Sequence, residues 1–372
     1  MKIALTHDHL FQIGGAQKVL LELHKIFPES PVYTLIHNPE KAGLFKDLQI
    51  KTSFLERLPF GKNHFKWYLS LMPIAWEQFN FSDYDIVISS SSAFSKGILT
   101  RPNTLHISYC HSPTRYLWSD AHRYVEELKQ PKIIKKILPL ILNRLRTWDH
   151  VAAQRVDKFI ANSEFVAKRI KKYYQRDSTV IYPPVDTKQF LISPRIDDYY
   201  VLVSRLRPYK RVDIAIKAFN QLHMPLKIIG SGEEEIRLKK IAKDNIEFLG
   251  ELSDIERNRV LSQAKAFIHP QEEDFGIAAV EAMACGRPVV AYKSGGALET
   301  VIEGETGVFF KEQTWEALAD TVIRFHRQEN QFDSVKIKAH AEKFDTEVFH
   351  QKMNDFVSQS WQEFSGEALM GY

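Results

Sequence analysis

The chain has 372 residues, of which 44% are hydrophobic and 26% are charged, and its formal net charge is +4. This length and composition predict two globular domains of ordinary size. A net charge this small, with no ordered basic and aromatic motif, argues against a nucleic-acid partner.

The first ten residues, MKIALTHDHL, lack the apolar core of a secretory signal, and no apolar run approaches the length of a membrane span. The two cysteines, Cys110 and Cys285, have no nearby Cys or His at metal-ligand spacing. We therefore expect reduced thiols in a cytoplasmic protein that is either soluble or peripheral on a membrane.

Short apolar runs alternate with longer helical patterns along the whole chain. Strands this apolar at consecutive positions are typical of parallel sheets covered by helices on both faces. The sequence therefore predicts an α/β fold of two doubly wound, Rossmann-like domains. The expected strands are residues 2–7, 31–37, 85–89, 105–110 and 158–162, and then 199–204, 226–230, 246–250, 266–270, 288–292 and 307–310.

Pro183 and Pro184 forbid a helix and hold the chain extended between the two halves. We place the interdomain linker there, with an N-terminal domain over residues 1–182 and a C-terminal domain over 183–345. Residues 346–372 have a helical pattern and no strand left to serve. We expect this helix to cross back to the N-terminal domain.

In doubly wound folds ligands bind beyond the carboxyl ends of the strands. After the first strand, His7, Asp8 and His9 suggest a metal site, but adjacent residues on an extended segment point to opposite faces and rarely chelate one ion. Gly14 and Gly15 then begin a helix, where they serve either a tight turn or the close approach of a ligand.

His111 directly follows the expected strand 105–110 and begins the loop HSPTRYLW. The residue alone does not distinguish a hydrogen-bonded structural histidine from one that contacts a ligand.

SRLRPYKR, residues 204–211, crowds several cations into a strand-to-helix turn. Arg205 and Lys210 would suit phosphate oxygens there, with the helix amides adding a dipole of the same sign, although a solvated basic turn is an equal alternative. Gly230 begins GSGEEE, half of a dinucleotide fingerprint without the third glycine, which disfavours a nicotinamide enzyme.

Residues 272–291, EEDFGIAAVEAMACGRPVVA, place Glu273 before an apolar helix and Glu281 inside it. A carboxylate in so apolar a helix needs hydrogen-bond donors, and the vicinal hydroxyls of a ribose would supply two. The amides of Phe275, Gly276 and Ile277 lie between the two carboxylates at a helix start and suit phosphate or sugar oxygens. The alternative is a structural pair that caps the helix or bonds to basic neighbours.

In this order the motifs resemble the retaining, nucleotide-sugar-dependent glycosyltransferases of family 4, which have the GT-B fold. The resemblance covers nearly the whole chain and rests on GGAQKV, CHSPTRYLW, YPPVD, SRLRPYKR, GSGEE, FLGELSD and the E-x7-E element of Glu273 and Glu281. HSPTRYLW is similar to the mannosyltransferases that assemble bacterial surface polysaccharides. The resemblance thus implies GDP-mannose as the donor and a saccharide acceptor.

The resemblance also assigns roles to individual residues. Arg205 and Lys210 would bind the donor pyrophosphate, and Glu281 would bind the ribose. Glu273 and the amides of Phe275 to Ile277 would hold the transferred sugar. His111 would meet that sugar from the opposite domain, with Gly14 and Gly15 near the phosphates and Leu252 near the base, while Gly230 completes the donor site. No metal or other cofactor is expected, because these cations and amides can stabilise the departing diphosphate.

Three other interpretations stay open. A UDP-glucose or UDP-N-acetylhexosamine donor is the nearest rival, because no residue here reads the base or the configuration at the sugar C2. A sugar-nucleotide epimerase of the same fold would need no acceptor. A non-catalytic sugar-binding module would be expected to lack Arg205, Lys210 or Glu273, and all three are present.

Two stretches indicate contact with an anionic membrane and hence a lipid-linked acceptor. Residues 129–148 are basic and place apolar side chains at helical spacing, namely Ile133, Ile134, Ile137, Ile141, Leu142 and Leu145. A second stretch, LPFGKNHFKWYLSLMPIAW, contains Trp67, Tyr68 and Trp76, which we expect to be exposed. The alternative is a helix packed on the N-terminal core with a solvated basic face.

Overall fold

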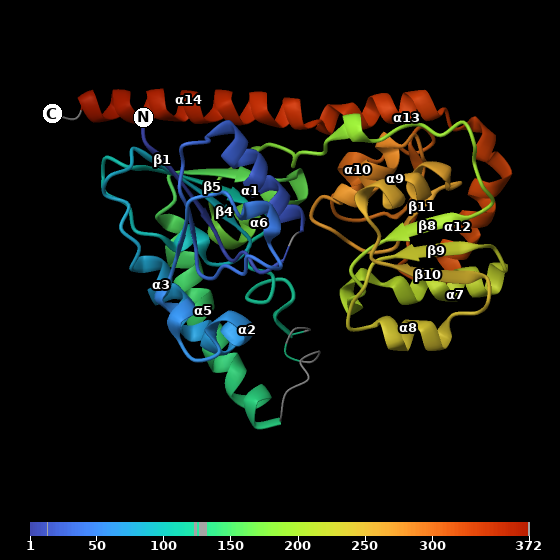
Figure 1. Ribbon diagram of the computed structural model, residues 1–372, viewed down its shortest axis with the longest axis horizontal. Helices are drawn as coiled ribbons and strands as arrows, with labels where there is room; N and C mark the ends of the chain where they lie inside the picture. Colours follow the sequence, from blue (N-terminus) through green and yellow to red (C-terminus); the bar gives the residue numbers. More distant parts are fainter. Residues whose placement is uncertain (13, 123–124, 126–131, 371–372) are drawn as a thin grey trace. The chain divides into compact units, whose positions relative to one another are not determined.

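The computed structural model describes residues 1–12, 14–122, 125 and 132–370 (Figure 1). The chain divides into two compact units, and we describe each by itself. Unit 1 comprises Met1–Tyr182 and Phe349–Tyr372, and unit 2 comprises Pro183–Val348.

Unit 1 is built on a parallel sheet of seven strands in the order β3-β2-β1-β4-β5-β6-β7. Its strands are β1 (Ile3–His7), β2 (Val32–Thr34), β3 (Ile50–Thr52), β4 (Ile86–Ser91), β5 (Leu105–Cys110), β6 (Lys158–Ala161) and β7 (Thr179–Val180). Its helices are α1 (Gly15–Ile26), α2 (Gly61–His64), α3 (Met72–Glu77), α5 (Lys132–Gln154), α6 (Glu164–Tyr174) and α14 (Thr346–Met370), with 3-10 turns η1 (Gly43–Phe45), η2 (Phe54–Arg57), η3 (Phe65–Leu71) and η4 (Ser95–Gly97).

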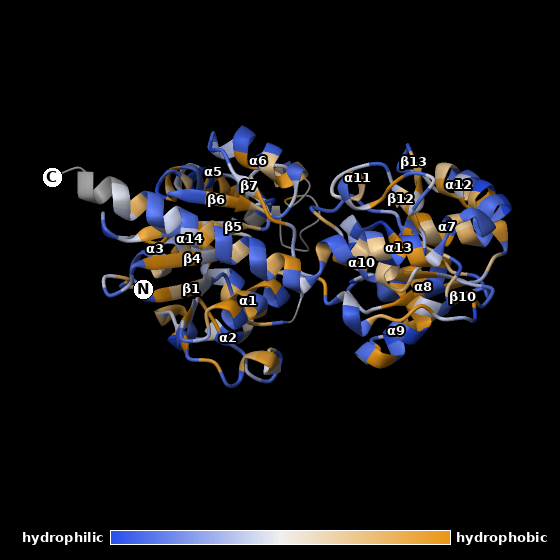
Figure 2. Ribbon diagram, turned by 90° about the horizontal axis from the view of Figure 1, so that it is seen from above, coloured by the Kyte–Doolittle hydropathy of each residue, from blue (hydrophilic) through white to orange (hydrophobic). Residues whose placement is uncertain are grey.

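Both faces of this sheet are covered. Leu5 and Ile88 point to one face, where they pack with α1 and with Phe349 and Met353 of α14. Ala4, Val87 and their neighbours point to the other face and pack with side chains of η3, α3 and α5. This double burial explains the continuous apolar strands, and β1 and β4 appear in hydrophobic colours in Figure 2.

Unit 2 has a parallel sheet of six strands in the order β10-β9-β8-β11-β12-β13. Its strands are β8 (Tyr200–Val203), β9 (Leu226–Ile229), β10 (Ile246–Gly250), β11 (Phe267–His269), β12 (Val289–Tyr292) and β13 (Gly307–Phe310). Its helices are α7 (Val212–Leu222), α8 (Glu235–Ile241), α9 (Asp254–Gln263), α10 (Ile277–Ala284), α11 (Ala297–Thr300), α12 (Trp315–Gln328) and α13 (Ser334–Ala341), with turns η5 (Thr187–Gln189), η6 (Pro208–Lys210), η7 (Glu329–Gln331) and η8 (Glu342–Phe344).

Two strands of unit 1, β3 and β7, fall outside the predicted set. Both lie at the ends of the sheet order, and neither has a fully buried residue. The other observed strands all overlap the predicted ones, so the two doubly wound parallel sheets confirm the predicted fold class.

The two stretches expected to contact a membrane differ from the prediction in several side chains. Trp76 is fully buried in the unit 1 core, so its predicted exposure is wrong. Leu142 and Leu145 of α5 are buried in the same core, whereas Ile137 is exposed. Residues 129–131, and the side chains of Ile133 and Ile134, lie outside the described part. No helix within that part is both long and apolar enough to span a bilayer.

Candidate active site

The residues predicted to bind the donor in unit 2 all lie beyond the carboxyl ends of its strands. Arg205 and η6 follow β8, Gly230 follows β9, Leu252 follows β10, and Glu273 follows β11. Backbone hydrogen bonds join these turns, because Leu206 donates to Ser231 at 2.8 Å and Gly230 donates to Gly250 at 2.7 Å. The edge of one sheet therefore brings together residues from Arg205 to Glu273, which are 68 positions apart in the sequence.

Lys210 and Glu273 form an ion pair at this edge. Arg211, in a left-handed conformation at φ +51°, ends η6 and begins α7, so Lys210 sits at a tight turn. Glu273 Oε1 also accepts a hydrogen bond from Gln271 Nε2 at 3.0 Å. Burial alone would raise the pKa of Glu273, but the charge of Lys210 and these hydrogen bonds outweigh it and lower the pKa to about 2.

Gln271 links Glu273 to a buried histidine that the sequence analysis did not single out. Gln271 Nε2 lies 3.3 Å from His269 Nδ1, and burial lowers the pKa of His269 to about 4. The imidazole is therefore neutral at pH 7. Gln271 and His269 sit on the strand end that carries Glu273, and a search two and four residues before the predicted carboxylate would have found them.

Gly276 has φ +97° and precedes α10, whose first amides are the Ile277 group and its successors. Ala279 N–H already donates to the Gly276 carbonyl at 3.0 Å. The amides that come before it, those of Ile277 and Ala278, have no acceptor within the helix and suit an oxygen-rich ligand. The side chain of Phe275 is buried against Phe344, which leaves only its backbone for such a role.

Two glycines that the sequence analysis missed hold the Glu273 loop in place. Gly296 N–H donates to the Glu273 carbonyl at 2.8 Å. A Cβ at Gly295 would lie 2.3 Å from that carbonyl, and one at Gly296 would lie 2.4 Å from the Phe275 Cα. The SGG sequence at 294–296 is thus the signal for this close backbone approach.

Glu281 lies in α10 and is 5% exposed. Its Oε1 is 3.8 Å from the Arg257 guanidinium of α9, so it has a basic neighbour as well as a position suited to a ligand. Both roles considered from the sequence are compatible with this position.

In unit 1, Gly14 and Gly15 begin α1 after β1, and His111 follows β5. His111 is 9% exposed and its Nε2 lies 2.8 Å from Ser90 Oγ on the neighbouring strand β4. Asp8, between the two histidines of THDH, accepts four backbone hydrogen bonds, from the amides of residues 92–95 at 2.6 to 2.9 Å. Asp8 therefore holds the turn after β4 in place.

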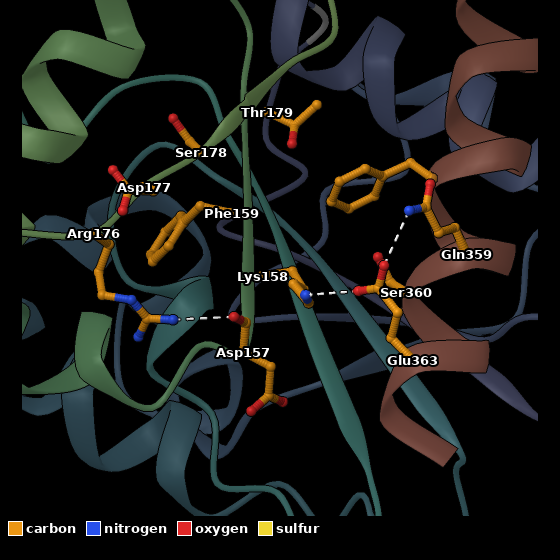
Figure 3. Close-up of a pocket in the computed structure, with 11 residues that line it drawn as sticks. Asp157, Lys158, Phe159, Arg176, Asp177, Ser178, Thr179, Gln359, Ser360 and Glu363 are labelled. Carbon is orange, nitrogen blue, oxygen red and sulfur yellow. Dashed lines mark hydrogen bonds and ion pairs between the residues drawn. The ribbon is translucent and has the colours of Figure 1, made fainter. Parts of the chain in front are cut away.

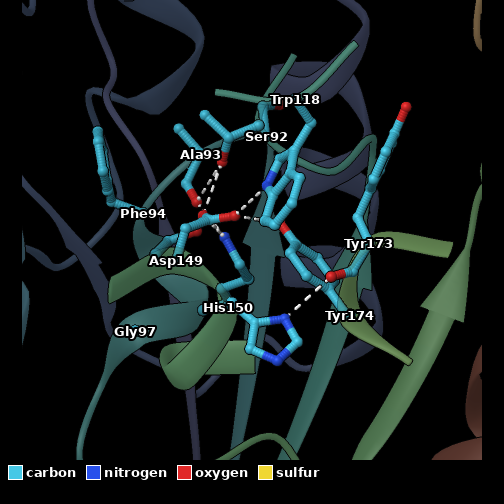
Figure 4. Close-up of polar contacts among 12 residues, drawn as sticks. Ser92, Ala93, Phe94, Gly97, Trp118, Asp149, His150, Tyr173 and Tyr174 are labelled. Carbon is cyan, nitrogen blue, oxygen red and sulfur yellow. Dashed lines mark hydrogen bonds and ion pairs between the residues drawn. The ribbon is translucent and has the colours of Figure 1, made fainter. Parts of the chain in front are cut away.

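The rest of the HSPTRYLW motif anchors its own loop (Figure 4). Thr114 Oγ1 and Trp118 Nε1 donate to the buried Asp149 of α5 at 2.9 and 2.7 Å, and Tyr174 adds a third donor at 2.8 Å. Asp149 also pairs with the buried Lys96. This satisfied polar cluster fixes the loop that begins at His111.

A cavity of about 520 Å³ lies elsewhere in unit 1, between the β6–β7 end of the sheet and α14 (Figure 3). Its charged side chains bond within the unit: Lys158 pairs with Glu363 at 2.9 Å, and Arg176 donates to the Asp157 carbonyl at 3.0 Å. None of the predicted site residues lines it.

Comparison with known proteins accounts for both units. Residues 13–189 match the family Glycosyltransferase Family 4, and residues 187–343 match Glycosyl transferases group 1. The α-1,3/1,6-mannosyltransferase ALG2 of Dictyostelium discoideum is 25% identical over 82% of this chain and 85% of its own length.

A GDP-mannose-dependent phosphatidylinositol monomannoside mannosyltransferase of Corynebacterium glutamicum is 37% identical over 32% of this chain and 35% of its own. Among solved structures, Anabaena HepE in complex with UDP superimposes with a TM-score of 0.76 at 20% identity, covering 96% of this chain and all of that one. The chain therefore has the GT-B fold and is an enzyme of the retaining glycosyltransferase family 4.

Proposed function

We propose that the enzyme transfers mannose from GDP-mannose to a lipid-linked saccharide in the synthesis of a bacterial surface polysaccharide. The observation that supports this proposal is the Lys210–Glu273 ion pair, whose carboxylate lies four residues before the first residue of α10 in the sequence. The mannosyltransferase relatives from Dictyostelium and Corynebacterium support a mannosyl donor.

In the proposed reaction, the acceptor hydroxyl oxygen forms a bond to the sugar C1 as the bond from C1 to the phosphate oxygen breaks. Arg205, Lys210 and the α10 amides would stabilise the negative charge on the departing diphosphate. The departing phosphate oxygen would take the acceptor proton on the same face of the sugar, so the configuration at C1 is retained. This scheme needs neither a metal ion nor a dedicated protein base.

The remaining roles follow the same assignment. Glu273 would hold the transferred hexose, Glu281 would bind the ribose, and Leu252 would lie near the base. His111, Gly14 and Gly15 of unit 1 would serve the sugar and phosphates.

A panel of nucleotide sugars tests the donor directly. Purified enzyme would be incubated with GDP-mannose, UDP-glucose or UDP-N-acetylglucosamine, a saccharide acceptor and excess EDTA, with products identified by mass spectrometry. Of the three donors, we expect only GDP-mannose to give free GDP and a hexosylated acceptor, and we expect EDTA to leave the rate of this transfer unchanged. Turnover of a UDP-sugar in preference would replace the donor assignment with the UDP alternative, which the UDP complex of HepE favours. A rearranged sugar released without acceptor would indicate the epimerase instead.

Exposed aromatic and basic side chains of unit 1 support a peripheral position on the inner face of the cytoplasmic membrane. Phe60 and Trp67 are 68% and 66% exposed, and their ring centroids are 6.2 Å apart. Exposed Lys62 and Lys66 lie between them in the sequence. Aromatic rings beside lysines are typical of segments that bind anionic lipid surfaces.

Helix α5 adds a second surface of the same kind. Ile137 and Leu140 are 51% and 70% exposed, on a helix whose Lys136 and Arg144 are also exposed. Leu142 and Leu145 face the core, so only the outward face of α5 is available to a membrane.

Vesicle flotation tests this placement. The enzyme should float with phosphatidylglycerol vesicles at low salt and not with phosphatidylcholine vesicles, because the basic residues need anionic headgroups. Trp67→Ser and Leu140→Glu should weaken flotation. Ile255→Glu, at an isoleucine of unit 2 that is 84% exposed, is the matched control and should float as wild type does. Absence of flotation at low salt would remove the membrane from the proposal.

A further inference from the structure

A chain of hydrogen bonds crosses the carboxyl edge of the unit 1 sheet and ends at His111. Gln17 Nε2 of α1 lies 3.1 Å from His7 Nε2 at the end of β1. His7 Nδ1 lies 3.1 Å from Ser90 Oγ of β4, and the same hydroxyl lies 2.8 Å from His111 Nε2. All four side chains are at least nine-tenths buried, with exposed fractions of 6%, 1%, 0% and 9% in that order.

The direction of this chain follows from its first member. Gln17 Nε2 also lies 3.4 Å from the backbone carbonyl of His9, which can only accept, so the amide nitrogen and not the amide oxygen faces this side. An amide nitrogen only donates, and therefore His7 Nε2 accepts.

The neutral charge state of both rings extends this direction to His111. Burial lowers the pKa of His7 to about 4, although Asp8 opposes the shift, and burial lowers the pKa of His111 to about 3. A neutral His7 that accepts at Nε2 carries its proton on Nδ1 and donates it to Ser90 Oγ. The Ser90 hydroxyl then donates to His111 Nε2, which leaves the His111 proton on Nδ1.

We infer that Gln17, His7 and Ser90 are positioning residues that hold His111 as the Nδ1–H tautomer, so that His111 offers an N–H donor to a sugar hydroxyl. The identity of that ligand rests on the proposed function, whereas the tautomer does not. Because Ser90 occupies Nε2, any contact that His111 makes with a sugar uses the opposite nitrogen of the ring.

Nitrogen NMR of the full-length enzyme tests the tautomer without any substrate. In a sample with ¹⁵N-labelled histidine at pH 7.5, two-bond correlations to the ring protons identify which nitrogen carries the proton, and His111→Gln assigns the signals. We expect a protonated Nδ1 and an unprotonated Nε2 for His111. A proton on Nε2, or on both nitrogens, would overturn the inference.

Strand β4 also supplies a matched control for activity. Ser89, the neighbour of Ser90 on β4, makes a similar buried bond to His106 Nε2 at 2.9 Å, and neither residue belongs to the proposed site. Ser90→Ala should lose the single tautomer of His111 and lower kcat/KM about three- to tenfold, the scale of one hydrogen bond. Ser90→Thr keeps the hydroxyl and should therefore retain the single His111 tautomer and the wild-type kcat/KM. Ser89→Ala should change neither the tautomer nor kcat/KM.

Equal losses of activity in Ser89→Ala and Ser90→Ala, with the His111 tautomer unchanged in both, would show that Ser90 is merely structural and overturn the inference. If wild-type enzyme transfers no sugar from any donor, the proposed function fails instead, and the NMR result still decides the tautomer.

Discussion

In the structure, the charges of Lys210 and Glu273 neutralise each other in an ion pair. The two side chains are only 16% and 19% exposed. Removing one charge leaves the other partly buried without its counterion, which costs stability as well as function. A loss of activity in a single variant therefore needs a stability measurement beside it.

We expect Glu273→Gln and Lys210→Met each to lower transfer at least 100-fold, because the pair lies where the sugar and diphosphate are proposed to bind. Stability should fall by about 1–3 kcal/mol in each variant, measured by urea unfolding at pH 7.5. Lys239→Met is the control, since its pair with Glu235 at 2.7 Å joins a Lys and a Glu on α8 that are 53% and 32% exposed. Transfer at the wild-type rate by a folded Glu273→Gln enzyme would contradict this site.

At the residue scale, the site residues that can be predicted from the sequence are those whose chemistry is visible without knowledge of their neighbours. Lys210 is conspicuous as one of several cations in a strand-to-helix turn and Glu273 as a carboxylate before an apolar helix, and the structure pairs the two side chains. Gln271 and Ser90 did not stand out, because an amide or a hydroxyl is unremarkable until its partners are known. Trp76 was misjudged for a related reason: a tryptophan in a short helix gives no sign of which face it occupies.

At the element scale, most of the predicted strands are largely buried, although β10 is also predicted and has only one fully buried residue. The burial of β1 and β4 is complete along their length, so a continuous apolar run marks them. The edge strands β3 and β7 have partly exposed residues and no such run. Their pairing depends on the neighbouring strand, and a local pattern does not record it.

The turn after β9 offers a prediction at this scale. Gly230 has φ +124°, and a Cβ there would lie 2.0 Å from the Ser204 carbonyl in the turn after β8. Gly250 also has positive φ, at +67°, but a Cβ there would meet no atom within 4 Å in the described structure. The two glycines thus separate backbone strain from a steric clash between adjoining turns.

Gly250→Ala should cost about 1–2 kcal/mol, the strain of a left-handed residue with a Cβ. Gly230→Ala should lower the free energy of unfolding by about 1–3 kcal/mol more than Gly250→Ala does, because the turns after β8 and β9 must also move apart. Urea unfolding of unit 2 measures both. Equal losses of stability in the two variants would mean that the turn after β8 moves away from the new Cβ at little energetic cost, which would contradict the predicted steric clash.

At the scale of the whole molecule, the two units carry different numbers of buried neutral histidines. Burial lowers the pKa of His7 to about 4 and those of His106 and His111 to about 3, all in unit 1. In unit 2, within the described residues, burial lowers the pKa to about 4 for His269 and by a smaller amount for His340. Lowering the pH should therefore reduce the free energy of unfolding of unit 1 more than that of unit 2.

The sign follows from proton linkage. An unfolded chain takes up these protons near pH 6.5, whereas the folded units take them up only near pH 3 to 4. Between these limits the unfolded state binds more protons, so the free energy of unfolding falls as pH falls, by up to about 1.4 kcal/mol per pH unit for each such histidine. This contribution to stability is complete above about pH 6.5 and is lost progressively toward pH 4.

Hydrogen exchange, read by mass spectrometry for each unit and corrected for the intrinsic pH dependence of exchange, checks this prediction. On going from pH 7.5 to pH 5, protection should fall further in the core strands β1, β4 and β5 than in β8, β11 and β12. His106→Gln should reduce the pH dependence of unit 1 by about one proton, because its imidazole has no role in the proposed site. Equal losses of protection in both units would contradict the prediction that the buried histidines make unit 1 the more acid-sensitive of the two.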